Sequence, residues 1–309
     1  SLLALLAWWL VGWWRGRAAR RARTADLASR RADALVGALL PTAWRVLAGV
    51  LRLAATLGAA WLAVQVLTRS DDPIGQITLV RLFVVLVALP WLAAWAIGRA
   101  HAATLHVLGG TLMIELRDRR IEVPVNAVEA LAAWRVPLPG GGVTLHARGS
   151  APLHLAGIDP RALEAGLAAG GRTLAPAPAR LADWWSAWAT TRHRWLDHPV
   201  VKFVLFPLVP ALPAFRLHQV IAYGGTFGEY YTYGLKAWLL GLLLWWASWA
   251  ANLALIATGL RALVEAGTGA TVLASPGHAV RVRRGLMTAA RVLYFVGIPA
   301  WLAWRLWPW

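Results

Sequence analysis

Long apolar stretches dominate the chain, and polar segments rich in Arg separate them. A helix needs roughly 20 apolar residues to cross a bilayer, and five stretches qualify: residues 46–67, 79–98, 199–223, 235–260 and 288–306. A sixth stretch, residues 2–14, is shorter and precedes its positive charges, an order that indicates an outward-facing N-terminal anchor rather than a signal peptide. The pattern therefore predicts an α-helical polytopic membrane protein with about six transmembrane helices.

The distribution of Arg between the apolar stretches predicts their orientation. Residues 15–45 contain eight Arg, residues 99–198 eleven and residues 261–291 five, whereas residues 224–234 contain none. Because Arg and Lys mark the cytoplasmic side of a membrane protein, the three Arg-rich segments are placed inside and both chain ends outside. We expect a multi-pass protein of the bacterial inner (cytoplasmic) membrane.

On this interpretation the chain has six segments. They are an N-terminal anchor (1–14), a basic cytoplasmic segment (15–45), a transmembrane hairpin (46–98), a cytoplasmic β domain (99–175), a linker with an interfacial helix (176–198) and a three-helix transmembrane region (199–309). Because the chain starts at Ser1 without a preceding Met, the anchor is expected to be the truncated end of a longer helix.

Between the second and third apolar stretches the pattern changes to an alternation with period two, which is typical of strands. Gly109-Gly110 separates two alternating runs, a two-residue hairpin signal. Asp159 and Pro160 then begin a short helix, which Gly170-Gly171 ends. The segment predicts a small antiparallel β domain closed by one helix, with six strands near residues 104–108, 111–116, 120–123, 127–136, 143–148 and 152–156.

The run GTLMIELRDRRIEVP (residues 110–124), followed by VNAV (residues 125–128), comes directly after the transmembrane hairpin. This order resembles the bacterial pleckstrin-homology-like (PH-like) domains of membrane proteins, over about residues 79–171. That family has seven strands, of which the sequence accounts for six. The resemblance implies a module that binds partners or acts as a scaffold, without catalytic residues.

Residues 176–198 form a Pro-rich linker followed by a Trp-rich helix. One helical face carries Leu181, Trp184, Trp185, Trp188, Trp195 and Leu196. Such a face favours a helix that lies on the inner leaflet. The alternative is a helix packed on the β domain.

The composition excludes several classes of protein. The chain is 59% hydrophobic and 15% charged, with a mean hydropathy of +0.55, unlike a soluble domain. Without Cys it has no disulfide or thiolate site. Its net charge of +17 is explained by Arg facing anionic lipid headgroups, so we expect no nucleic-acid partner. No Asp or Glu lies deep within an apolar stretch, which argues against a proton-driven pump.

The most unusual stretch is residues 199–234. Pro207, Pro210 and Pro213 recur every three residues, which predicts a kinked or broken helix. The candidate binding surface beyond them consists of Arg216, His218, Gln219, Tyr223, Glu229, Tyr230, Tyr231 and Tyr233. We expect Arg216 or His218 to contact Glu229, a lipid phosphate or a partner subunit. The alternative is an interface-anchored turn with Gly hinges.

These patterns favour a non-enzymatic accessory or scaffold subunit of a membrane or envelope complex. Its expected partners are membrane lipids and other membrane protein subunits, bound through the β domain and the Tyr-rich outer connection. A transporter or lipid-handling permease, with residues 199–223 lining its path, is the alternative. A membrane enzyme that acts on a lipid-linked substrate through Arg216, His218 and Glu229 is less favoured. We expect no catalytic residue, cofactor or metal, although His193, Asp197 and His198 form a weak potential metal cluster.

Overall fold

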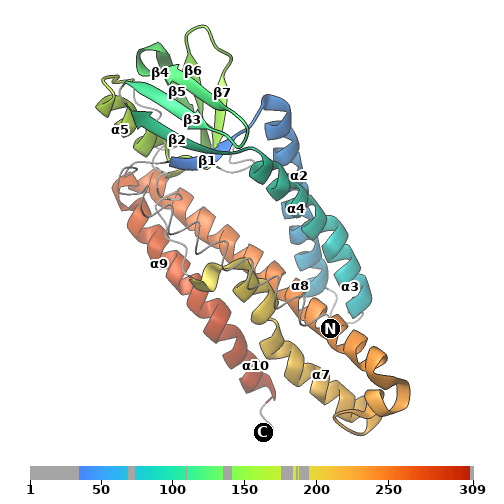
Figure 1. Cartoon of the computed structure of the whole chain (residues 1–309). Helices are drawn as coiled ribbons and strands as arrows, with labels where there is room; N and C mark the ends of the chain where they lie inside the picture. Colours follow the sequence, from blue (N-terminus) through green and yellow to red (C-terminus); the bar gives the residue numbers. More distant parts are fainter. Residues whose placement is uncertain are drawn as a thin grey trace.

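A computed structural model of the chain describes residues 35–68, 74–108, 110–134, 141–174, 184–185, 187 and 195–306. This part is mostly helical and contains five helices that are long and apolar enough to cross a membrane, together with one antiparallel sheet (Figure 1). The expected anchor (residues 2–14) and residues 15–34 of the basic segment (residues 15–45) lie outside the described residues.

The sheet has seven strands, one more than the sequence predicted. They are β1 (Leu35–Leu39), β2 (Ala102–Leu108), β3 (Thr111–Glu115), β4 (Arg120–Pro124), β5 (Val128–Ala133), β6 (Gly142–Ala147) and β7 (Leu153–Ala156). Their spatial order is β4-β3-β2-β1-β7-β6-β5, and every pair is antiparallel. The six predicted strands and the helix α5 (Pro160–Ala169) are confirmed.

The additional strand β1 is the middle strand of the sheet. It comes from the segment expected to be only a basic connection, before the helical hairpin, and it pairs with β2 on one side and β7 on the other. Leu35 lies opposite Leu105, and Ala38 lies opposite both Ala102 and Ala156. Without β1, the sheet would divide into two three-stranded halves. The sheet domain therefore includes chain from both sides of the hairpin.

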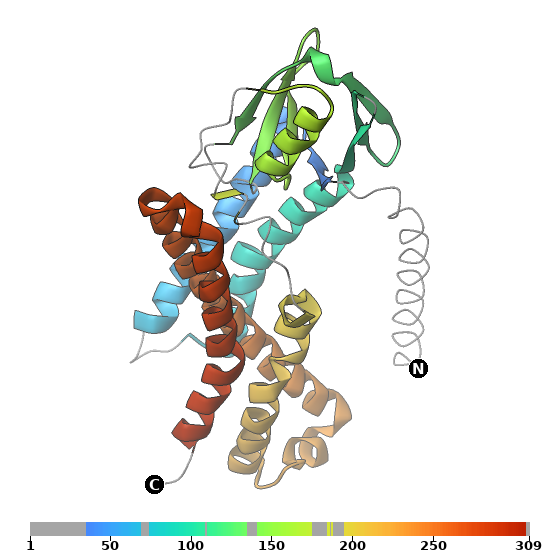
Figure 2. The same ribbon diagram turned by 90° about the vertical axis from the view of Figure 1, so that its left-hand side faces the viewer.

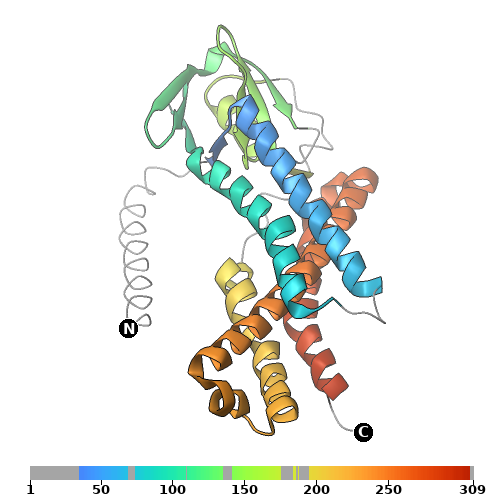
Figure 3. The ribbon, with the colours of Figure 1, turned by 90° about the vertical axis from the view of Figure 1, so that its right-hand side faces the viewer.

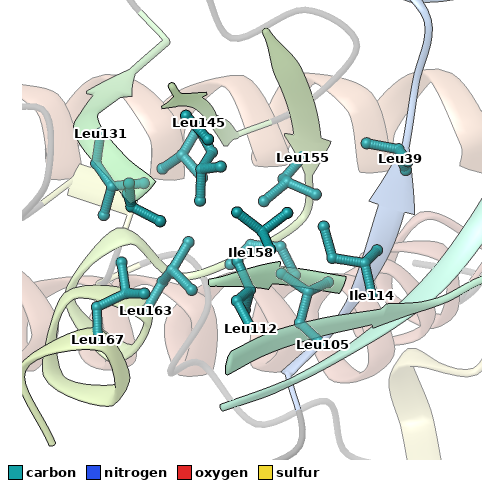
Figure 4. Close-up of a cluster of buried hydrophobic side chains, with 14 of the residues drawn as sticks. Leu39, Leu105, Leu112, Ile114, Leu131, Leu145, Leu155, Ile158, Leu163 and Leu167 are labelled. Carbon is teal, nitrogen blue, oxygen red and sulfur yellow. The ribbon is translucent and has the colours of Figure 1, made fainter. Parts of the chain in front are cut away.

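The core of the sheet domain is formed by apolar side chains that alternate along the strands and point at α5. Figure 4 shows Leu39 of β1 and Leu155 of β7 facing the same interior as Leu163 and Leu167 of α5. The Asp159 carboxylate caps the helix by accepting a hydrogen bond from the backbone N of residue 161 at 3.0 Å. The closed core explains why this small domain can hold its shape.

Two long helices descend from the sheet and form a hairpin (Figure 3). The first is α2 (Thr42–Thr68), and the second is the continuous helix α3 (Gln76–Phe83), η1 (Val84–Ala88) and α4 (Leu89–Ala100), where η1 is a π-helical turn. Small residues line their contact. A methyl group on Gly58 would lie 2.6 Å from the carbonyl oxygen of Leu86, so the two backbones approach closely.

The C-terminal region contains three further long helices, and two of them are longer than expected. It comprises η3 (Trp195–Asp197), η4 (Val201–Leu205), α7 (Leu208–Tyr223), α8 (Gly228–Ala274), η5 (Pro276–His278), α9 (Ala279–Val292), η6 (Leu293–Gly297) and α10 (Ile298–Leu306). Residues 261–287, predicted to be an inner loop, are instead the paired ends of α8 and α9. Beyond its kink at Gly234, α8 is about 60 Å long, twice the apolar thickness of a bilayer.

The proline-rich stretch breaks only once. The break follows the π-helical turn η4, at Phe206 and Pro207, as predicted. Pro210 and Pro213, however, lie inside the regular helix α7. Pro210 occupies the first turn, where its missing N–H would have had no helical partner. The prediction that three prolines together prevent a regular helix was therefore wrong.

The described part of the Trp-rich segment (residues 181–196) is Trp184, Trp185, Ala187, Trp195 and Leu196. The first three pack against protein, whereas Trp195 is 73% exposed. Trp185 is buried against the sheet domain, where its Nε1 donates to the carbonyl oxygen of Trp134 at 3.2 Å. Ala187 and Trp184 pack instead with Val272 of α8 and with α9. This arrangement favours the alternative to an interfacial helix, a segment that joins the sheet domain to the α8–α9 ends.

The position of β1 predicts how the sheet domain behaves in isolation. A protein in which residues 35–40 and 101–174 are joined by a short Gly-Ser linker should fold, because Leu39 N already donates to His101 O at 2.9 Å. It should give a strand-dominated circular dichroism spectrum and a cooperative thermal transition. Residues 101–174 alone should show neither. Equal cooperative unfolding of both fragments would show that β1 is dispensable.

Candidate functional site

The segment predicted to form the binding surface lies where α7 ends and α8 begins, at the end of the helices farthest from the sheet (Figure 1). Gly224 ends α7 with a φ of 72°, a left-handed conformation that favours glycine. Residues 228–233 form a short helical turn, which Gly234 breaks with a φ of 85° before α8 continues. The two glycines therefore fold this outer connection (residues 224–234) back on the helix ends.

Gln219 and Glu229 fasten the outer connection to α7. Gln219 is fully buried, and its Nε2 donates to Glu229 Oε2 at 2.6 Å. The backbone N of Glu229 donates to Gln219 Oε1 at 3.1 Å, so the same two residues bond twice. A methyl group on Gly241 of α8 would lie 2.9 Å from the Glu229 carboxylate, so a side chain at this position would displace the carboxylate.

Of the contacts expected for Arg216 or His218, the one with Glu229 is not formed, while those with a lipid phosphate or a partner subunit stay predictions. In the part of the chain that the structure describes, no ion pair joins Glu229 to a cation, and its carboxylate accepts from Gln219 instead. Arg216 is exposed, and the His218 ring lies 5.5 Å from the ring of Trp245 on α8. Of these three side chains of α7, only Gln219 is buried, so it is the one that the folded-back connection meets.

The four Tyr of the predicted surface form two groups. The Tyr223 and Tyr233 rings lie 6.2 Å apart, and His218 lies 6.0 Å from Tyr223. Tyr230 and Tyr231 form a second pair at 5.3 Å, and Tyr231 is 81% exposed. Exposed aromatic rings at a helix end suit both a partner surface and a membrane interface. The exposed Tyr rings are therefore compatible both with a binding surface and with a turn anchored at the membrane interface.

The double hydrogen bond predicts the effect of Gln219→Leu. The variant loses both bonds and leaves the half-buried Glu229 carboxylate without its donor, which should lower the free energy of unfolding by about 1–3 kcal/mol. Chymotrypsin should also cleave faster within the outer connection, after its Tyr residues. Gln65→Leu on α2 is the matched control, because Gln65 makes no side-chain hydrogen bond within the described residues. Unchanged cleavage in Gln219→Leu would contradict the assigned role.

An apolar cleft of about 470 Å³ lies between α7, α8 and α10. Figure 2 shows α7 and α10 running side by side at the end of the helical region that points away from the sheet. The cleft is lined by Phe206, Val209, Pro210, Pro213, Ala214, Leu217, His218, Ile221, Trp245, Trp249, Ile298, Pro299, Leu302 and Ala303. Its size is that of a small-molecule pocket, and His218 is the one titratable side chain in its lining.

Acidic side chains near the sheet-side ends of α8 and α9 are paired with Arg. Glu265 accepts from both terminal nitrogens of Arg283 at 2.8 Å and from Arg261 Nε at 2.7 Å. Arg283 is buried, with a side-chain exposure of 1%. Asp197 pairs with Arg291, whose NH2 group lies 2.6 Å from Oδ2. These contacts allow charged helices to pack where the sequence predicted a loop.

A polar network joins the sheet domain to the first turn of α2. Trp134 Nε1 donates to Thr144 Oγ1 at 3.0 Å, and Thr144 lies 3.0 Å from His154 Nδ1. Arg45 Nη1 donates to the same Nδ1 at 3.3 Å, and Thr42 Oγ1 lies 3.2 Å from Nε2. With Nδ1 as the acceptor, the ring is neutral and its proton is on Nε2.

The environment of His154 lowers its pKa from the ordinary value of 6.5. Burial is the main cause, and the positive charge of Arg45 and the nearby His146 lower the pKa further. The unfolded chain therefore binds a proton more readily than the folded chain, so protonation favours unfolding. Neutral His154 therefore stabilises the folded protein at pH values above its ordinary pKa. This stabilisation is lost as the pH falls through the lower pKa that His154 has in the folded protein.

The thermal stability of the protein should accordingly decrease as the pH is lowered from 7.5 to 5.5. His154→Asn should remove part of this dependence, because an amide can accept the Thr144 hydrogen bond without titrating. His146→Asn is the control, since His146 is exposed and should leave the dependence nearly intact. A pH profile unchanged in His154→Asn would rule out this assignment.

No group of three or more His, Asp or Glu within the described part of the chain is placed to hold a metal ion. Of the weak potential cluster, His193 lies outside the described residues and Asp197 pairs with Arg291. No protein-family model, curated protein or solved structure matches the chain. The residues and their geometry therefore carry the functional conclusion.

Proposed function

We propose that the chain is a non-enzymatic membrane scaffold or accessory subunit that holds its sheet domain against the cytoplasmic surface of the bacterial inner membrane. The observation that carries this proposal is the rigid junction between the sheet and the helices. The middle strand β1 leads into α2 through two residues, and α4 leads into β2 through one. A domain built in this way cannot pivot away from the membrane, so it offers partners a fixed surface.

Further features support the membrane and PH-like parts of the proposal. Five long apolar helices fit a multi-pass protein, and the sixth crossing that we propose, at residues 2–14, lies outside the described residues. Lys202, Arg261 and Arg291 all lie at the sheet-side ends of the expected spans, in agreement with a cytoplasmic sheet domain. A seven-stranded antiparallel sheet with one closing helix fits the resemblance to PH-like domains better than the six strands predicted.

The partner surfaces that we propose lie at opposite ends of the molecule. Val36 projects from the outer face of β1 and is 73% exposed, which is unusual for an apolar residue on a central strand. At the other end the outer connection exposes Tyr231 and Tyr233. Other membrane protein subunits would bind these two surfaces, while lipids cover the helices between them.

A second candidate function, lipid handling, is favoured by the apolar cleft between α7, α8 and α10. The cleft of about 470 Å³ is lined almost entirely by apolar side chains, as a site for a lipid chain requires. A scaffold role does not need such a cleft. Lipid handling alone, however, gives no reason for the rigid junction with the sheet.

Site-specific photo-crosslinking in native membranes tests the scaffold proposal. A photoreactive amino acid at Val36 or Tyr231 should give discrete protein adducts of constant mass. The same amino acid at Leu243, an exposed position in the middle of α8, should give no protein adduct because lipid covers it. Absence of protein adducts at both Val36 and Tyr231 would refute the scaffold role and leave lipid handling as the better candidate.

A further inference from the structure

A second, smaller cavity of about 160 Å³ lies next to the apolar cleft, between η4, α8 and the α9–η6 helix. Its charged lining residues are Lys202, Arg261, Arg291 and Asp197. We call it the cationic cavity. The aromatic rings of Phe206, Tyr294 and Phe295 stand between it and the apolar cleft, with centroids 4.8–5.0 Å apart. The two spaces share no lining residue, and these largely buried rings separate them.

The cationic cavity carries an excess of positive charge. Three cations line it, against one carboxylate, Asp197, which is already paired with Arg291. Arg261 donates to Glu265, but that carboxylate is shared with the buried Arg283. Within the described residues, no carboxylate lies within 4.0 Å of the Lys202 ammonium, whose nearest described partner is the Tyr294 ring, with its centroid 4.9 Å away.

An uncompensated positive charge in a partly buried site is costly, and a bound anion reduces that cost. Two guanidinium groups and an ammonium group around one small cavity suit phosphate in particular, since Arg binds its oxygens in pairs and Lys acts as a point charge. The volume of about 160 Å³ suits a single phosphate group rather than a nucleotide.

The position of the cavity indicates where the phosphate comes from. Lys202, Arg261 and Arg291 begin or end three of the expected membrane spans, so the cavity lies at the level of lipid headgroups. Basic pockets between transmembrane helices on the cytoplasmic side are typical sites for anionic lipids.

We propose that the cationic cavity binds the phosphate of an anionic membrane lipid. Lys202 supplies a positive charge that has no carboxylate within 4.0 Å among the described residues, and Arg261 and Arg291 supply directed N–H donors. The site is separate from the proposed partner surfaces, so it holds whether or not the chain acts as a scaffold.

Native mass spectrometry of the full chain in detergent tests the proposal, with dioctanoyl phosphatidylglycerol as the anionic probe and dioctanoyl phosphatidylcholine as the zwitterionic one. The wild type should bind phosphatidylglycerol more tightly. Lys202→Gln should weaken this binding about tenfold, the effect of losing one charge-assisted hydrogen bond. Lys202→Arg, which keeps the charge, should retain most of the affinity.

Arg261→Gln is the second variant, because Glu265 keeps its bonds to Arg283 when Arg261 is removed, and folding should persist. It should weaken phosphatidylglycerol binding to a similar degree. The matched controls are Lys236→Gln at the outer end of α8 and Arg284→Gln on the exposed face of α9. Each control removes one positive charge without touching the cavity, so binding should be unchanged.

Three results would overturn the proposal. The first is equal binding of the two lipids, and the second is an equal loss of affinity in the cavity variants and the controls. The third comes from a competition with inorganic phosphate. If millimolar phosphate displaces the lipid and itself binds as tightly, the cavity serves a soluble phosphate compound and not a lipid.

Discussion

The fold depends on the main-chain pairing of β1 between β2 and β7. The backbone N–H and C=O groups of a central strand need hydrogen-bond partners on both sides of the strand. For β1 these partners are β2 and β7, which the whole helical hairpin separates from β1 in the sequence. The hairpin is held at both ends by adjacent strands, with Leu39 N bonded to His101 O at 2.9 Å. The helices therefore extend from the sheet as a fixed continuation, and the orientation of the sheet relative to the helices follows from this pairing.

Other contacts between the sheet domain and the helices reinforce the same arrangement from different directions. The His154 network ties β6 and β7 to the first turn of α2, and the Arg45 guanidinium lies 4.1 Å above the Trp134 ring. On the opposite side, Trp185 packs under Trp134 while its neighbour Trp184 packs on α8 and α9. The sheet is thus fastened to both groups of helices, although only the α2–α4 hairpin is joined to it through β strands.

Local patterns in the sequence predicted the long helices, six strands and α5, because each has its own periodicity. They missed β1, since LVGAL is a short, continuously apolar run in which strand and helix look alike. They also missed the cationic cavity. Lys202, Arg261 and Arg291 come from three helices, and each alone is typical of a side chain that reaches for the membrane surface. The partner of Glu229 was missed because charge suggested a cation, whereas burial selected Gln219.

The neighbouring positions of β1 and β2 have a consequence for biogenesis. If the hairpin helices span a bilayer, as proposed, the chain between these two strands crosses it an even number of times, because an odd number would leave the strands on opposite sides. A hairpin inserted with one helix missing could never complete the sheet. During synthesis β1 emerges before the hairpin but waits for β2 and β7, so the sheet closes only after insertion is finished. A complete sheet can therefore form only in a chain in which both hairpin helices have been inserted.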